Sequence, residues 1–132
     1  MDKKTIDLIK MCLERAREKL KSANDLLKAG DWSDCVSRAY YCVFHTTQAI
    51  LSSEGLSANT HQGLLNLFGL YFVKTGKFDK KFAKIIHNLK DDRENGDYEI
   101  YSVIDAEVAE VAVKEAEQFL KEAERYLKKY LK

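Results

Sequence analysis

The chain has 132 residues, 45% of them hydrophobic and 33% charged, which predicts a single domain over residues 1–132 with solvated helical faces. Its formal net charge of +1 excludes a global electrostatic attraction to nucleic acid or membranes, so any such binding has to come from a local patch. No apolar run approaches the ~20 residues of a membrane span, no signal-type hydrophobic core follows the N-terminus, and proline is absent, which together predict a cytoplasmic, helical protein that does not contact membranes.

Glycines divide the chain into five expected helices. Gly30, Gly55, Gly76 and Gly96 fall where amphipathic patterns stop, and glycine is preferred just past a helix C-terminus. In chain order, the expected helices are 5–29, 31–53, 60–73, a fourth that starts from a cap at Asp79 and stops before a linker at 95–101, and 105–130. Short turns between such helices predict an all-α fold, an up-and-down antiparallel bundle of about five helices.

The second expected helix is predicted to be central, because apolar residues fill two adjacent rows of it at helical spacing. A third row, Arg38, Tyr41 and His45, is polar and shares one face. An arginine on a buried helix costs several kcal/mol unless it is paired or faces water. The row is therefore either a structural network or, together with Tyr40, the wall of a phosphate- or nucleotide-binding site.

A second arginine follows the apolar stripe of the fourth helix. Extending that stripe by one turn reaches Arg93, which is therefore expected to face inward or toward a groove. Asp97 and Tyr98 come shortly after it. Helix capping by the arginine and turn chemistry in the linker are the structural explanations for this group.

Other residue types argue against common chemistries. Three cysteines without CxxC spacing are expected to be reduced core residues. The histidines have no metal-ligand spacing, so neither a metal site nor a cofactor is expected. Walker, GxGxxG and Gly-x-Ser-x-Gly motifs are absent from the sequence. A run of lysines at 74–84 is more typical of a solvated face than of a phosphate-binding patch.

Several blocks, in this order along the chain, resemble the HEPN domain, in particular its short stand-alone prokaryotic branch. They are Ser37-Arg38-Ala39-Tyr40-Tyr41 through Phe44-His45, Thr60-His61-Gln62-Gly63, 67–76, and Arg93-Glu94-Asn95-Gly96-Asp97-Tyr98. The resemblance covers about residues 5–130 and implies a helical bundle that usually dimerises, with a polar groove near the dimer interface. It also implies RNA as a substrate class. Many members are metal-independent ribonucleases, often toxins paired with a small nucleotidyltransferase antitoxin.

The sequence departs from the family's catalytic signature, an arginine and a later histidine with four to six residues between them. Arg93 matches the arginine, but residues 94–99 contain no histidine, and Asp97 and Tyr98 occupy its place. Arg38 and His45 have the spacing, but they lie on the wrong helix. We therefore expect a HEPN-type module that binds nucleotide or RNA phosphates, as one half of a toxin–antitoxin-like pair with a minimal nucleotidyltransferase.

In this interpretation Arg38 and Arg93 hold phosphate, Tyr40, Tyr41 and His45 shape the pocket, and Asp97 and Tyr98 form its rim. One alternative is a metal-independent endoribonuclease that uses Arg93 with Asp97 or with His45. The other is a purely structural interaction bundle. A homodimer is expected because the second and third helices carry an excess of apolar and aromatic residues.

Overall fold

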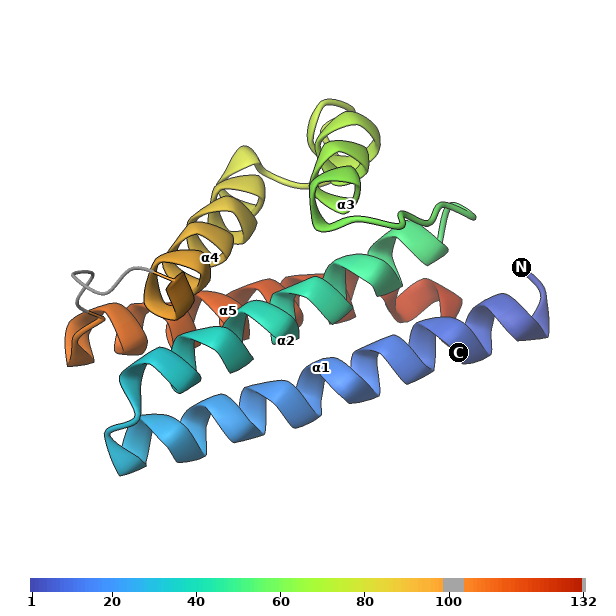
Figure 1. Ribbon diagram of the computed structural model, residues 1–132. Coiled ribbons are helices and arrows are strands. Elements are labelled where there is room, and N and C mark those ends of the chain that lie inside the picture. Colours follow the sequence, from blue (N-terminus) through green and yellow to red (C-terminus); the bar gives the residue numbers. More distant parts are fainter. Residues whose placement is uncertain (99–103, 132) are drawn as a thin grey trace.

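Five α-helices make up the structure, a computed structural model that describes residues 1–98 and 104–131, without the side chains of 96–98 (Figure 1). They are α1 (Lys3–Ala29), α2 (Trp32–Ser52), α3 (His61–Phe68), α4 (Lys80–Tyr98) and α5 (Ala106–Leu127). A π-helical turn, η1 (Gly69–Val73), extends α3, and a 3-10 turn, η2 (Lys128–Tyr130), follows α5. Within the described ranges there is no strand, and the expected all-α bundle is confirmed.

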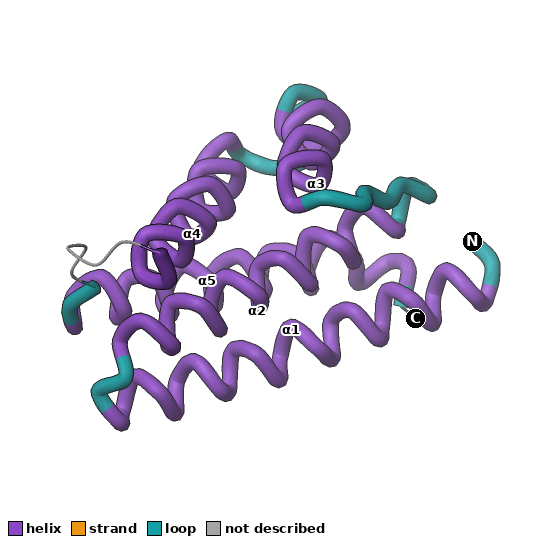
Figure 2. Tube along the Cα trace, in the orientation of Figure 1, coloured by secondary structure: helices purple, strands orange, loops and turns teal. Residues whose placement is uncertain are grey.

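Helix α2 lies at the centre of this arrangement, as its two apolar rows predict. It contacts α1, α3, α4 and α5, and α1 also packs against α5. Figure 2 shows α1, α2 and α5 lying lengthwise together, while α3 and α4 cross α2 on the side away from α1. Helices α1 and α2 are antiparallel, whereas α5 runs in the same direction as α2, because the segment containing α3 and α4 returns the chain to the start of α2.

Three glycines end their segments in the expected way, and one does not. Gly30, Gly55 and Gly76 have positive φ angles of 78°, 72° and 81°, a conformation that glycine adopts without a Cβ clash. Gly96 instead lies inside α4, which continues to Tyr98. The prediction of a helix stop at Gly96 and of a linker from residue 95 is wrong. A glycine in a helix interior costs only about 1 kcal/mol, which packing of α4 on α2 and α5 can outweigh.

The start of α3 is fixed by a cap. The Thr60 hydroxyl oxygen accepts a hydrogen bond from the Gly63 backbone N–H at 2.9 Å. A Cβ on Gly63 would lie only 2.9 Å from that oxygen, so glycine fits this cap where a larger residue would displace it. The cap makes His61 the first residue of α3 and directs this end of the helix toward α2.

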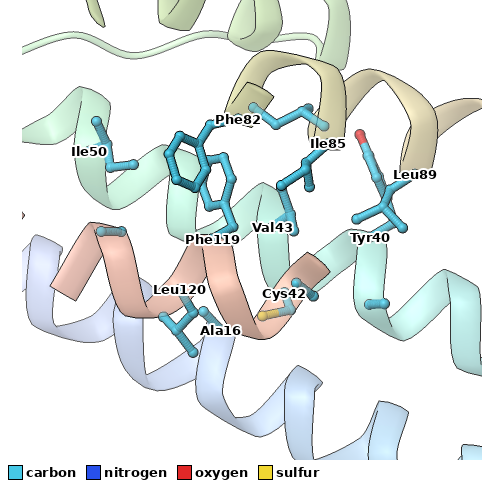
Figure 3. Packing of buried hydrophobic residues seen from close by; sticks show 14 of the residues in the cluster. Ala16, Tyr40, Cys42, Val43, Ile50, Phe82, Ile85, Leu89, Phe119 and Leu120 are labelled. Carbon is cyan, nitrogen blue, oxygen red and sulfur yellow. The ribbon is translucent and has the colours of Figure 1, made fainter. Parts of the chain in front are cut away.

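The core forms between α2 and the helices around it. Figure 3 shows Val43 of α2 close to Ile85 of α4 and Phe119 of α5, with Leu120 near Ala16 of α1. All three cysteines, Cys12, Cys35 and Cys42, are free and buried, as expected. Burial raises the pKa of Cys35 to about 11 and that of Cys42 to about 12, so these thiols stay protonated and act as small core residues. No helix in the described part of the chain is long and apolar enough to cross a bilayer.

The core makes a direct stability prediction. Phe119 is fully buried, and Phe119→Ala should lower the free energy of unfolding by about 3–5 kcal/mol, because it removes a large apolar side chain and leaves a cavity. Val111 lies on the same helix but is 48% exposed, so Val111→Ala should change stability by less than about 0.5 kcal/mol. Urea unfolding followed by circular dichroism measures both. Equal losses in the two variants would contradict the described packing of α5.

Candidate nucleic-acid interface

An aromatic cluster forms where α2 meets the first turn of α3. It consists of Tyr40, Tyr41, Phe44 and His61. The three α2 residues lie at steps of one, three and four, so they occupy neighbouring positions on one side of that helix. The His61 ring centroid lies 4.6 Å from that of Phe44, 5.5 Å from that of Tyr40 and 6.2 Å from that of Tyr41. The capped start of α3 therefore places the His61 imidazole against the two tyrosine rings.

The imidazole is held by a hydrogen bond as well as by packing. His61 Nδ1 lies 2.8 Å from the Tyr40 hydroxyl oxygen. Tyr40 is 1% exposed, and burial raises its pKa to about 12, so its hydroxyl is neutral in the physiological range. Burial, followed by the positive charges of Arg93 and Lys90, lowers the pKa of His61. The imidazole is therefore predominantly uncharged at neutral pH.

Helix α4 places a guanidinium over the same two tyrosines. The Arg93 Cζ atom lies 5.0 Å from the Tyr41 ring centroid and 5.7 Å from that of Tyr40, within the range of a cation–π interaction. Glu94, the next residue, forms an ion pair with Lys90 one turn earlier, at 2.9 Å. The arginine thus faces the site, as the stripe of α4 predicts, while its acidic neighbour is paired along the helix.

Tyr41 also lines an open hollow of about 430 Å³. It is lined by Lys19, Ser37, Arg38, Tyr41 and His45, from α1 and α2. None of these residues is acidic, so the hollow presents two permanent positive charges without a carboxylate among its lining residues. The hollow is suited to an anion larger than a water molecule.

The polar row of α2 is less buried than its position on the central helix suggested. Arg38 is exposed, so the desolvation cost considered for it does not arise. His45 is half-buried, and its Nδ1 atom lies 3.0 Å from the Gln48 side-chain oxygen. Burial lowers the pKa of His45, and the positive charges of Arg15 and Lys19 lower it further. The row therefore forms one wall of a wet surface instead of a buried network.

The structure brings most of the predicted residues together in two groups that share Tyr41. One group is the hollow, with Arg38, Tyr41 and His45, and the other is the tyrosine pair beneath Arg93. Asp97 and Tyr98 lie in the last turn of α4, and their side chains are outside the described part of the structure. The exposed lysines at positions 74–84 lie on a different surface, and one of them, Lys77, pairs with Glu54 at 2.6 Å.

Sequence reasoning assigned no site role to four residues of this surface: Lys19, Ser37, Phe44 and His61. Two signals for His61 were present in the sequence: it belongs to the block Thr60-His61-Gln62-Gly63 that resembles the HEPN domain, and the capping threonine before it places it at the start of a helix. Lys19 belongs to a charged stretch of α1 with no feature that separates it from its neighbours. Among the residues with described side chains, no group of three His, Cys, Asp or Glu residues has the arrangement of a metal site.

Comparison with known proteins identifies the fold. The sequence profile of the HEPN domain matches residues 9–126. The chain belongs to the HEPN domain family. Every candidate residue named above therefore lies inside the HEPN domain.

Three relatives cover most of this HEPN chain. A protein named "Putative toxin" from Methanocaldococcus jannaschii is 35% identical over 111 residues, which span 84% of this chain and 82% of the relative. A UPF0332 protein from Thermotoga maritima is 36% identical over 112 residues, which span 85% of each chain. A second "Putative toxin" from M. jannaschii is 29% identical over 98 residues, which span 74% of this chain and 67% of that one.

The lowered pKa values of His45 and His61 predict a pH dependence of folding. The unfolded chain takes up protons at these histidines near pH 6.5, whereas the folded HEPN domain resists protonation until a lower pH. The free energy of unfolding should therefore fall as the pH decreases below about 6.5. Urea titrations between about pH 7.5 and 5.5 measure this slope.

A matched pair of substitutions assigns the effect. His45→Gln should reduce the slope, because it removes one of the two groups that bind more protons when unfolded. His61→Gln removes the other such group and should also reduce the slope. A slope of the same size in both variants and the wild type would show that other groups control acid stability.

Proposed function

We propose that this HEPN protein binds nucleotide or RNA phosphates at the surface formed by the hollow and the aromatic cluster. The observation that carries the proposal is the position of Tyr41, which lines the cationic hollow of Arg38 and also supports the guanidinium of Arg93. A ligand that passes over Tyr41 would meet positive charge on both sides. Successive phosphates along an RNA strand provide such a ligand.

The residue types around Tyr41 suit this ligand. Guanidinium groups form bidentate hydrogen bonds with phosphate oxygens, and lysine adds a point charge. Exposed faces of tyrosine can stack with bases, a contribution of about 1–3 kcal/mol per base. Because the net charge of the chain is only +1, such binding would come from this local concentration of charge. The rim is assigned to Asp97 and Tyr98, at the end of α4.

We extend the proposal to a toxin–antitoxin-like pair that acts in the cytoplasm. Two relatives carry the name "Putative toxin", and both are similar to this chain over most of its length. The family resemblance suggests a minimal nucleotidyltransferase as the antitoxin. A partner of this kind would neutralise the protein by covering or modifying the surface around Tyr41.

A homodimer is part of the same proposal, but the residues that support it differ from those expected from the sequence. The apolar residues of α2 lie mostly in the core and are not available for a dimer interface. The exposed apolar side chains near the third helix are Leu70 and Tyr71 of η1, which are 51% and 43% exposed. A dimer that forms through η1 would leave the hollow between α1 and α2 open to RNA.

RNA binding tests the proposal directly. Fluorescence anisotropy with a labelled single-stranded RNA should show salt-dependent binding. Arg38→Ala combined with Arg93→Ala should abolish binding while the helical circular dichroism signal remains, because the two charges flanking Tyr41 are lost. Lys19→Gln should weaken binding by about 1 kcal/mol or less and make the salt dependence shallower by about 0.7 in slope, as expected for one lost contact with single-stranded RNA.

A lysine on the same helix provides the control. Lys21 is exposed and pairs with Asp25, so Lys21→Gln removes the same charge from α1 outside the hollow. It should leave affinity within about twofold of the wild type. Full binding by the double arginine variant, or equal losses in the Lys19 and Lys21 variants, would contradict the assigned surface.

The toxin–antitoxin part makes a separate prediction in cells. Expression of the protein in a bacterial host should slow growth, and the double arginine variant should not, because it cannot hold RNA phosphates. Co-expression of a minimal nucleotidyltransferase, if one is encoded beside the gene, should restore growth. Colony counts after induction measure both effects. Equal toxicity of the wild type and the variant would show that growth inhibition does not depend on the surface around Tyr41.

A further inference from the structure

A recess of about 210 Å³ lies at the end of the bundle where α1 begins and α2 ends (Figure 1). The connection from α2 to α3 closes it on a further side. Its walls are mainly apolar, with one leucine each from α1, α2, the connection and α3, namely Leu8, Leu51, Leu56 and Leu64. None of the residues that line the recess is charged, so its chemistry differs from that of the cationic hollow.

The recess and the hollow lie along one seam between α1 and α2. A single face of α1 carries, at steps of four, three and four, the residues Leu8, Cys12, Arg15 and Lys19. A single face of α2 carries, at the same steps, the residues Tyr41, His45, Gln48 and Ser52. Because the two helices are antiparallel, the residues of the hollow meet toward one end of the seam and those of the recess toward the other.

Two side chains connect the hollow with the recess. His45, in the wall of the hollow, places its Nδ1 atom 3.0 Å from the side-chain oxygen of Gln48, which lines the recess. On α1, the exposed Arg15 lies between Cys12 of the recess and Lys19 of the hollow. Burial raises the pKa of Cys12 and lowers that of His45, and the positive charge of Arg15 acts on both groups. A guanidinium is therefore within electrostatic reach of both sites.

We propose that the recess holds a pyrimidine base of an RNA strand whose phosphates are bound by the hollow and by Arg15. The inference rests on the proposed binding of RNA phosphates and adds a preference among bases to that function. A strand that follows the seam places its charged backbone against the cations and one neutral, largely apolar base in the uncharged recess.

The volume of the recess favours a pyrimidine over a purine. An engineered apolar cavity of about 150 Å³ accommodates one molecule of benzene. Scaled by the number of heavy atoms, a pyrimidine base needs about 200 Å³ and a purine about 250–280 Å³. The 210 Å³ of the recess therefore matches a pyrimidine, whereas a purine would bury only part of its ring system there.

The lining suits both the faces and the edge of such a ring. Leucine side chains provide apolar contact for the faces. The polar groups for the edge are the amide of Gln48, which carries both donors and an acceptor, and the hydroxyls of Ser52 and Ser57. Ser52 Oγ donates to the Gln48 backbone oxygen at 2.8 Å, so the lone pairs of its oxygen can accept a hydrogen bond from a base. Apolar walls with a few polar groups that fix orientation are typical of ligand pockets.

Fluorescence anisotropy of the full chain with two labelled RNA octamers, one of uridine and one of adenosine, tests the inference. The wild type should bind the uridine octamer at least ~10-fold more tightly, which corresponds to about 1.4 kcal/mol. Gln48→Met keeps the length of the side chain and removes its amide, so it should reduce this ratio to within about twofold. Since stacking within the adenosine strand also affects the wild-type ratio, the change in the ratio is the deciding measurement.

Two further variants serve as controls. Gln62→Met makes the same change at an exposed residue of α3, whose amide bonds to Asn66 outside the recess, and it should leave the ratio unchanged. Arg15→Gln removes the charge between the two sites. It should weaken the binding of both octamers by a similar factor and make the salt dependence shallower by about 0.7 in slope, because a phosphate contact carries no base preference.

Photocrosslinking locates the bound base. A uridine octamer that contains 4-thiouridine should, on irradiation, attach to peptides that contain Cys12 or Ser57, identified by mass spectrometry. Ser57 is exposed at the edge of the recess, and Ser57→Leu adds an apolar side chain there. This variant should lose the crosslink and most of the preference for uridine while its circular dichroism spectrum stays that of the wild type.

The outcomes distinguish the inference from the function on which it rests. Equal affinity of the wild type for both octamers, or a ratio that Gln48→Met leaves unchanged, would overturn the inference and leave phosphate binding intact. If Ser57→Leu alters the oligomeric state in size-exclusion chromatography but keeps the ratio, the recess is a protein contact and the inference is wrong. A wild type that binds neither octamer would overturn the proposed function, and the inference with it.

Discussion

The arrangement of the site depends on the burial of Tyr40. Its ring is 1% exposed, fixed on the central helix with Leu89 of α4 close by, while its hydroxyl bonds to His61 and its face lies under Arg93 (Figure 3). A single side chain therefore connects the start of α3 and the last turns of α4 to α2. Because a buried aromatic ring fixes the positions of its neighbours closely, groups from three helices can hold a defined geometry without a metal or a disulfide.

Much of the fold was predictable because its signals are local and periodic. The two apolar rows of α2 require partners on several sides, and the structure supplies them from four helices. Gly30, Gly55 and Gly76 adopt the positive φ angles that glycine favours after a helix, and they lie where the expected segments end. At Gly96 the helix continues to Tyr98 instead, and the sequence around it contains no sign of this. A cost of about 1 kcal/mol per glycine is too small to determine a helix end by itself.

The site was predictable only where one helix determines it. Arg38, Tyr41 and His45 share a face because of helical spacing, and the structure finds them in one hollow. Lys19 and His61 could not be placed in the same way, because their positions depend on how α1 and α3 cross α2. Crossing angles depend on the detailed shapes of side chains at each contact, which apolar stripes do not specify. The sequence therefore revealed the residues of α2 and the direction of Arg93, whereas the residues from α1 and α3 required coordinates.

The electrostatics of the surface indicate what it is adapted for. In both site histidines, burial lowers the pKa and neighbouring positive charges lower it further, Arg15 and Lys19 for His45, and Arg93 and Lys90 for His61. These charges repel a proton from each imidazole, and the repulsion lowers the stability of the folded protein only as the pH falls below about 6.5. A bound phosphate would reverse this effect, because its negative charge offsets the repulsion and raises the pKa of each imidazole toward neutrality. A rise of both histidine pKa values when a phosphate binds would therefore distinguish a binding surface from a structural network.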